Sequence, residues 1–162
     1  MKVVLTRIDN RLIHGQILEA WIPSIRANCI VVANDQVAER TFQRVLMEAA
    51  VPRGIRVAIV TVEETKEFLD SPELATCRVL LLFANSADAR RAHRLGVNFP
   101  ELNLGNMHAG ERTMRLTCTL ALDPTDIENL KYLEEEGVRI VSQCVPADRP
   151  QDWHKLIRGL EG

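Results

Sequence analysis

The feature that most constrains the fold of this chain is a series of short apolar segments, each followed by a longer amphipathic segment. The apolar segments have the length of β-strands, and apolar residues in the segments between them recur at helical spacing. Polar and apolar residues hardly alternate within the short segments, which indicates strands buried on both faces. Such strands are typical of a parallel sheet covered by helices. The expected strands span residues 3–6, 29–33, 56–60 and 79–84, and the expected helices span residues 13–21, 37–50, 62–69 and 87–95.

The last third of the chain is less regular. Strands are expected at residues 101–105 and 138–145, a helix at 126–136, and a strand-like segment at 114–122. A chain of 162 residues suits one hydrophobic core. We therefore expect a single domain over residues 1–162, of the α/β class. It should contain one open, mainly parallel, twisted sheet with helices on both faces and one antiparallel element near residues 114–122.

Residues at the expected helix ends agree with this reading. Asp35 and Ser86 stand where N-caps are expected, because their short polar side chains can accept hydrogen bonds from free amides of the first turn. Gly54 and Gly96 follow the expected helices as stop signals.

Composition and charge exclude several classes of function. The formal net charge of −2 provides no basic field for nucleic acid and no polybasic surface for anionic lipid. No apolar segment approaches the roughly 20 residues of a membrane span. Arg7 and Asp9 end the first apolar segment too early for a signal peptide, so a cytoplasmic protein is expected. Neither G-x-G-x-x-G nor a Walker loop occurs, which argues against a nucleotide-binding enzyme.

The four cysteines, Cys29, Cys77, Cys118 and Cys144, are widely spaced. No C-x-x-C pair is present, so neither a zinc site nor a redox motif is indicated. We expect all four to be buried free thiols. The sequence indicates no metal site and no cofactor.

The candidate site follows the first strand, because ligands of open α/β sheets bind outside the carboxyl ends of the strands. Residues 7–16 combine two arginines, a carboxylate, an imidazole and a glycine. A neutral imidazole at His14 could act as a nucleophile while its second nitrogen is held by a hydrogen bond. Arg11 could offer its planar guanidinium to phosphoryl oxygens, and free amides of the following helix could point at the same place. On chemistry alone, however, a single histidine near a helix start is more often a cap or a satisfied polar residue.

The candidate catalytic residues are therefore His14, Arg11 and Asp9. Other strand ends also carry small polar residues, which suit an anionic ligand. His108, in the loop after Asn103, could reach the rim of the site. The remaining candidates for binding a phosphoryl group are Arg7, Asn10, Gly15, Gln16, Asn34 and Asp35.

The segment RIDNRLIHGQ at residues 7–16 resembles the active-site signature of the IIB components of the mannose/fructose/sorbose family of the bacterial sugar phosphotransferase system. The resemblance covers essentially the whole chain, in order. It continues in Trp21, in VVAND at residues 31–35, in P-x-G at 52–54, in NLGNM at 103–107 and in Gly137-Val138.

The resemblance implies a phosphoryl carrier. His14 matches the phosphorylated histidine, which takes a phosphoryl group from a phosphohistidine of a IIA component, through Nδ1. It then passes the group to a hexose bound by the membrane components IIC and IID. Arg11 matches the arginine that contacts the phosphoryl group, Asp9 an aspartate that orients His14 or Arg11, and Arg7 a position whose role is less defined. A homodimer and a peripheral association with the membrane components are also implied.

Two positions depart from the family pattern. Asn10 stands where a second aspartate is frequent, and Asn106 stands where a second glycine is common. Neither change touches His14 or Arg11, so we expect transfer to persist; whether the two changes alter the choice of partner stays open. Two alternatives stay open at this point: a regulatory module that carries the same phosphorylated histidine without sugar transport, and a small α/β enzyme that uses the loop as a plain phosphate site.

Overall fold

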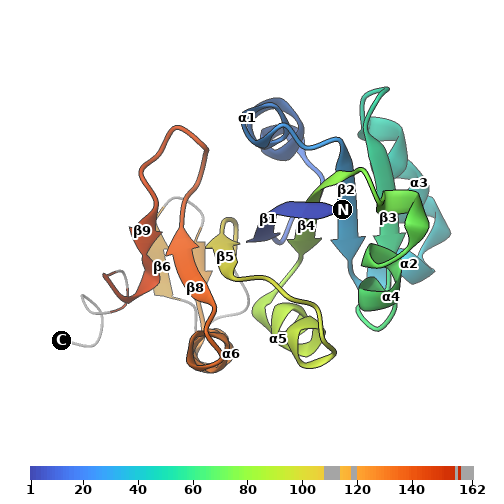
Figure 1. Cartoon of the computed structure of the whole chain (residues 1–162). Helices are drawn as coiled ribbons and strands as arrows, with labels where there is room; N and C mark the ends of the chain where they lie inside the picture. The colour runs from blue at the N-terminus through green and yellow to red at the C-terminus, as the bar shows by residue number, and fades with distance from the viewer. Residues whose placement is uncertain (108–113, 118–119, 156, 158–162) are drawn as a thin grey trace.

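The computed structural model describes residues 1–107, 114–117, 120–155 and 157. Seven strands form one sheet in the order β3-β2-β4-β1-β5-β8-β9 (Figure 1). Every pair in this sheet is parallel except β8 and β9. The strands are β1 (Lys2–Ile8), β2 (Cys29–Ala33), β3 (Arg56–Val60), β4 (Arg78–Phe83), β5 (Glu101–Leu104), β8 (Arg139–Ser142) and β9 (Gln151–Asp152).

The expected fold class is confirmed: the sheet is mainly parallel and lies between helices. The antiparallel element near residues 114–122 is a separate two-stranded sheet, formed by β6 (Met114–Thr117) and β7 (Leu120–Leu122). Strand β9 was not predicted, because two residues are too few for a period-two pattern. It adds a second antiparallel pair at the edge of the main sheet.

Helices cover both faces of the sheet, as expected. One face buries side chains of α4, η2, α5 and α6, and the other buries side chains of η1, α1 and α2. The helical elements are η1 (Ile17–Trp21, a π-helix), α1 (Ile22–Ile25), α2 (Asp35–Glu39), α3 (Thr41–Ala50), α4 (Thr65–Leu69), η2 (Pro72–Leu74, a 3₁₀ turn), α5 (Ser86–Arg94) and α6 (Pro124–Glu135).

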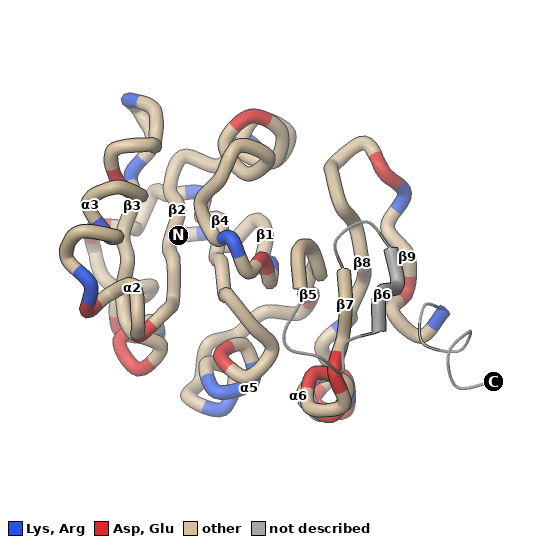
Figure 2. The backbone as a smooth tube through the Cα atoms, turned by 180° about the vertical axis from the view of Figure 1, so that it is seen from behind, with Lys and Arg blue, Asp and Glu red and all other residues tan. Residues whose placement is uncertain are grey.

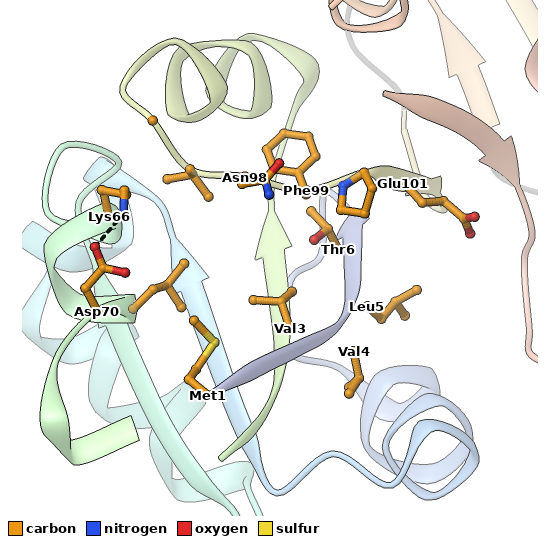
Figure 3. Close-up of a pocket in the computed structure, with 14 residues that line it drawn as sticks. Met1, Val3, Val4, Leu5, Thr6, Lys66, Asp70, Asn98, Phe99 and Glu101 are labelled. Atoms are coloured by element: carbon orange, nitrogen blue, oxygen red, sulfur yellow. Dashed lines mark hydrogen bonds and ion pairs between the residues drawn. The ribbon is translucent and has the colours of Figure 1, made fainter. Parts of the chain in front are cut away.

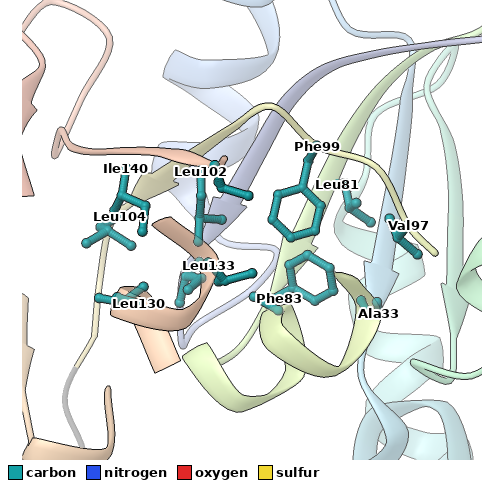
Figure 4. Packing of buried hydrophobic residues seen from close by; sticks show 14 of the residues in the cluster. Ala33, Leu81, Phe83, Val97, Phe99, Leu102, Leu104, Leu130, Leu133 and Ile140 are labelled. Atoms are coloured by element: carbon teal, nitrogen blue, oxygen red, sulfur yellow. The ribbon is translucent and has the colours of Figure 1, made fainter. Parts of the chain in front are cut away.

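Strand β2 shows why the apolar segments do not alternate. All five of its residues are buried, with Val31 and Ala33 facing α5 while Ile30 and Val32 face η1. On the α5 face the rings of Phe83 and Phe99 lie 5.9 Å apart, beside leucines of β5 and α6 (Figure 4). Complete burial of an aliphatic or aromatic side chain stabilises the fold by roughly 1.5–3 kcal/mol, so these strands hold the sheet between its helices.

Helices α5 and α6 pack side by side, with basic residues on α5 and acidic residues on α6 (Figure 2). Arg90 joins them, because its Nη1 donates to Asn129 Oδ1 at 3.1 Å and its Cζ lies 4.2 Å from the centre of the Tyr132 ring. A buried hydrogen bond from Ser86 Oγ to Asp126 Oδ1, at 2.6 Å, adds a second link. This pair of helices supports β4 and β5, whose carboxyl ends flank the loop that follows β1.

The helix expected at residues 37–50 is wrong in one respect, because it is broken at Arg40, whose backbone is extended between α2 and α3. The predicted N-caps are each displaced by one residue. Asn34 caps α2 by accepting from Val37 N at 2.9 Å, and Asn85 caps α5 by accepting from Asp88 N at 2.8 Å. In both cases an Asn precedes the predicted cap and already satisfies the free amide, so Asp35 and Ser86 fall inside the first turn.

The prediction of four free thiols is wrong for Cys144, which is disulfide-bonded. Spacing along the sequence does not reveal which sulfurs the fold brings together. Cys29 is a buried free thiol, as expected, and its burial raises its pKa to about 11, whereas Cys77 is free but only half-buried. Cys118 lies outside the described residues.

No helix in the described part of the chain is long and apolar enough to cross a membrane.

Candidate functional site

The loop after β1 is fixed to the carboxyl ends of both neighbouring strands. Asp9 N donates to Phe83 O of β4 at 2.9 Å, and Asn10 N donates to Asn106 O at 2.7 Å. On the β5 side Gly105 N donates to Ile8 O at 2.9 Å. The loop is therefore held at the edge of the sheet where ligands of open α/β folds bind.

The loop turns back on itself through Leu12. Leu12 N donates to Asp9 O at 2.9 Å, and Leu12 adopts a left-handed backbone with a φ of 56°. A left-handed conformation costs a residue with a Cβ about 1–2 kcal/mol. The side chain of Leu12 is buried, and that burial offsets the cost. The turn brings His14 back towards Asp9.

His14 and Asp9 form the centre of the site. His14 Nε2 lies 2.9 Å from Asp9 Oδ2, and the Asp9 carboxylate is completely buried while the His14 side chain is 13% exposed. Asp9 Oδ1 also accepts from Arg11 N at 3.1 Å, and Asp9 Oδ2 accepts from Asn106 Nδ2 at 3.0 Å. A buried carboxylate needs such partners, since an unpaired charge is very costly in the interior.

These partners decide the charge of Asp9. Burial alone would raise the pKa of its carboxyl, but hydrogen bonds and charges from His14, Arg7 and Asn106 together outweigh burial and hold the pKa below its ordinary value. Asp9 is therefore an anion at neutral pH. A carboxylate anion accepts from a ring N–H, so the contact assigns a proton to Nε2, and the tautomer that makes this contact carries its lone pair on Nδ1.

Arg7 is a buried cation beneath this centre, with 1% of its surface exposed. Its Nε lies 3.5 Å from Asp9 Oδ2, and its Cζ lies 4.6 Å from the centre of the Trp21 ring. Burial lowers the pKa of Arg7 to about 10, although Asp9 opposes that shift, so Arg7 stays charged at neutral pH. Its terminal nitrogens donate to Asn103 Oδ1, to Gln143 O at 2.7 Å and to Cys144 O at 3.2 Å. A contact between Arg7 and a phosphoryl group stays a prediction.

Gly105 is required by the position of Arg7, because a Cβ at residue 105 would overlap the Arg7 guanidinium. We expect Gly105→Ala to destabilise the protein by about 1–3 kcal/mol, the usual cost of forcing extra volume into a packed site. Urea unfolding measures the loss. Gly15→Ala is the control, since a Cβ at residue 15 meets nothing within 4 Å. An equal, small effect of both substitutions would contradict this account of Gly105.

Arg11 is exposed and lies at the mouth of the site. Its Nη2 is 3.5 Å from Gln16 Oε1, and no stronger partner holds its guanidinium among the described residues. A cavity of about 270 Å³ lies beside Arg11, large enough for a small anion, and the first helical residues, Gly15 and Gln16, follow His14. The cavity is lined by Arg7, Arg11, Gln16, Gly105, Asn106, Cys144, Val145 and Asp148.

A larger cavity of about 490 Å³ lies elsewhere, along the amino-terminal half of β1 (Figure 3). Its walls include Val3, Phe99 and the exposed Lys66–Asp70 ion pair, but no residue of the loop 9–16. The larger cavity is therefore separate from the His14 centre. The smaller cavity is not lined by His14 itself, but Arg11 and Gln16 of the same loop line it, so it is the candidate site.

The structure does not join two of the predicted residues to this centre. Asn34 caps α2, and Asp35 accepts from Val62 N at 2.9 Å and pairs with Arg91 at 2.9 Å. Both follow β2, which β4 separates from β1. Their role in phosphoryl binding stays a prediction, and His108 lies outside the described residues.

Sequence reasoning missed the role of three polar residues around the centre. Asn103 and Gln143 hold Arg7, and Asn106 holds Asp9. The signals in the sequence were the position of Asn103 and Asn106 in and just after an expected strand, and their place in the NLGNM segment that carries the resemblance. Gln143 gave no signal, because its contact uses the backbone carbonyl.

The sequence of this chain also matches a known protein family and several of its members. A family model described as PTS system sorbose subfamily IIB component matches residues 3–161. The chain is 34% identical over 148 residues to a PTS system sorbose-specific EIIB component of Klebsiella pneumoniae, covering 91% of this chain and 90% of the relative. It is 32% identical to a PTS system mannose-specific EIIAB component of Escherichia coli, covering 99% of this chain and 50% of that relative.

The fold of this chain is also similar to a solved structure of the same family. The crystal structure of the IIBSor domain of the sorbose permease from Klebsiella pneumoniae superposes with a TM-score of 0.90 and 32% identity, covering 98% of each chain. The family match spans nearly the whole chain and the fold is the same. The chain therefore belongs to the family of sorbose-subfamily IIB components of the sugar phosphotransferase system, and it is a phosphotransferase.

Proposed function

We propose that His14 is the residue that carries the phosphoryl group, and that Nδ1 is the atom that accepts it. The hydrogen bond between His14 Nε2 and buried Asp9 carries this proposal. Because Nε2 holds the proton, the Nδ1 lone pair is the nucleophile of the ring. The family transfers phosphoryl groups during sugar uptake, and His14 is the nucleophilic side chain at the centre of the site.

In the first transfer, the Nδ1 lone pair attacks the phosphorus of a phosphohistidine on a IIA component. The bond from phosphorus to the donor nitrogen breaks, and its electron pair stays with the donor ring. The His14 ring gains positive charge as the new bond forms, and the buried anion of Asp9 stabilises that charge. In the second transfer a hydroxyl oxygen of a hexose attacks the phosphorus, the electron pair of the Nδ1–phosphorus bond returns to His14, and the hydroxyl proton is released to solvent.

Asp9 and Arg11 have different roles in this proposal. Asp9 orients the ring, because its Oδ2 holds Nε2 at 2.9 Å. Arg11 reaches the phosphoryl oxygens, because its exposed guanidinium has only a weak contact to Gln16. Arginine suits three equatorial oxygens, since its planar nitrogens donate in pairs. Amides at Gly15 and Gln16 add donors at the helix start.

We expect Arg11→Ala to slow phosphorylation by about 10- to 100-fold, because one charge-assisted donor to the transferring group is lost. The unfolding midpoint in urea should hardly change, since Arg11 is exposed and bonded only weakly. Arg53→Ala, a substitution of another exposed arginine, is the matched control and should leave the rate unchanged. A large loss of stability in Arg11→Ala would instead make Arg11 a structural residue.

The partners are proposed from the family. One relative is named a mannose-specific EIIAB component, and this chain spans half of it, which supports a IIA domain as the phosphoryl donor. We propose that IIC and IID membrane components present the hexose, and that the chain works at the cytoplasmic face of the membrane. A homodimer remains a prediction, which sedimentation of the purified protein tests.

The experiment for this function is to incubate the protein with a phosphorylated IIA component and to map the label. Wild type should accept one phosphoryl group, and His14→Ala should accept none. Equal labelling of both proteins would end the proposal. Membranes that contain IIC and IID, added together with the hexose, should then release the label as sugar phosphate. If phospho-His14 forms but no membrane component accepts its phosphoryl group, the regulatory alternative is favoured.

A further inference from the structure

Asn106 is one of the two positions, with Asn10, at which this chain departs from the family pattern. It lies in the loop after β5, is 4% exposed and borders the cavity beside Arg11. Its Nδ2 donates to Asp9 Oδ2 at 3.0 Å, and its backbone carbonyl accepts from Asn10 N at 2.7 Å. A single residue of the β5 loop therefore holds both the carboxylate and the backbone of the β1 loop.

Asp9 Oδ2 is the oxygen that matters, because it receives two side-chain donors. His14 Nε2 lies at 2.9 Å and Asn106 Nδ2 at 3.0 Å from this one atom. The other oxygen, Oδ1, is held by Arg11 N. With both oxygens restrained, the carboxylate has a fixed rotation, and the direction of its bond to His14 is fixed with it.

We propose that Asn106 is a positioning residue for phosphoryl transfer, which acts through Asp9 to hold the His14 ring with Nδ1 directed outward. This inference rests on the proposed function of His14. The amide of Asn106 touches neither the ring nor the transferring group in this role. It supplies a neutral donor that keeps the Asp9 carboxylate in place without adding charge to the site.

The donor role and a space-filling role predict opposite orders for two substitutions. Asn106→Ala removes one donor to Asp9 Oδ2, so that this oxygen keeps only the contact with His14 and the more distant Arg7. Asn106→Asp keeps the shape but replaces the donor with a second acceptor that repels Asp9. If Asn106 acts as a donor, Asn106→Asp is the more damaging change; if it only fills space, Asn106→Ala is.

The test measures phosphorylation by a phosphorylated IIA component for wild type, both variants and a control. Asn98→Ala is the control, because Asn98 is an exposed asparagine in the connection that leads into β5. We expect kcat to fall about tenfold in Asn106→Ala and further in Asn106→Asp, the order of effect that follows loss of an outer hydrogen bond. KM for the IIA component should change little, since Asn106 is buried.

A second readout separates positioning from structural damage. In ¹⁵N spectra of the unphosphorylated protein at alkaline pH, wild type should show His14 protonated at Nε2, and both variants should show a mixture of the two ring tautomers. Urea unfolding identifies any variant that fails to fold. An unchanged kcat and an unchanged tautomer in a folded Asn106→Ala variant would overturn the inference. Failure of wild type itself to be phosphorylated on His14 would instead overturn the proposed function.

Discussion

Replacement of Arg7 by methionine is expected to destabilise the protein by about 3–5 kcal/mol, the cost of removing one partner from a buried ion pair. Asp9 would lose the cation 3.5 Å away, and two backbone carbonyls would lose the donors that now satisfy them. The Trp21 ring would also lose the guanidinium stacked on it. Equilibrium unfolding in urea measures the difference.

Arg44→Met is the matched control for this prediction. Arg44 pairs with Glu48 at 3.1 Å on the exposed side of α3, where both side chains are well solvated. Exposed pairs of this kind contribute about 0.2–1 kcal/mol. The double variant Arg7→Met/Asp9→Asn removes both charges and should recover part of the loss. A cost for Arg7→Met as small as that of Arg44→Met would show that the buried arginine does not support the site.

Asp9→Ala is expected to lower the rate of His14 phosphorylation by about 10²- to 10³-fold, within the range for loss of acid–base assistance at a catalytic group. Without Asp9 the ring loses both its orientation and the anion that stabilises its developing charge. Rapid mixing with a phosphorylated IIA component measures the rate. A reduction of less than about threefold in a folded variant would contradict the role given to Asp9.

The ionisation of Asp9 also makes the unfolding free energy depend on pH. Its folded pKa is lowered, so the stability it contributes is fully present above about pH 4, the ordinary carboxyl value, and is lost as pH falls through the folded pKa. Asp9→Asn, which keeps the shape without the charge, should therefore differ most from wild type near neutral pH. The difference in unfolding free energy should shrink on acidification.

Much of the fold could be predicted because the buried strands carry their signal locally. Strand β2 is an unbroken apolar run whose five residues are all buried, and its predicted bounds agree with the structure. Helix α3 shows the limit of such patterns. Its apolar spacing gave the helix, yet Phe42 is 78% exposed and Val45 and Leu46 are exposed beside it. Spacing identifies an apolar face but not what that face contacts.

The candidate site also has a part that local sequence predicts and a part that only the fold brings together. The loop 9–16 is contiguous, so the candidate residues His14, Arg11 and Asp9 could be selected from one segment of sequence. The contact of Asn106 with Asp9 joins residues 97 positions apart, and the contact of Arg7 with Asn103 joins residues 96 apart. Such pairs depend on the order of strands in the sheet, which places β5 beside β1. No local pattern contains that information, which is why these supports were found only in the structure.

We propose that Nδ1 of His14 receives the phosphoryl group because Asp9 holds Nε2. The most direct test is a ¹⁵N and ³¹P NMR spectrum of the phosphorylated protein with ¹⁵N-labelled histidine. We predict that the phosphorus couples to Nδ1 of His14 while Nε2 remains protonated. A phosphoryl group on Nε2 of His14, or on any other residue, would contradict the account.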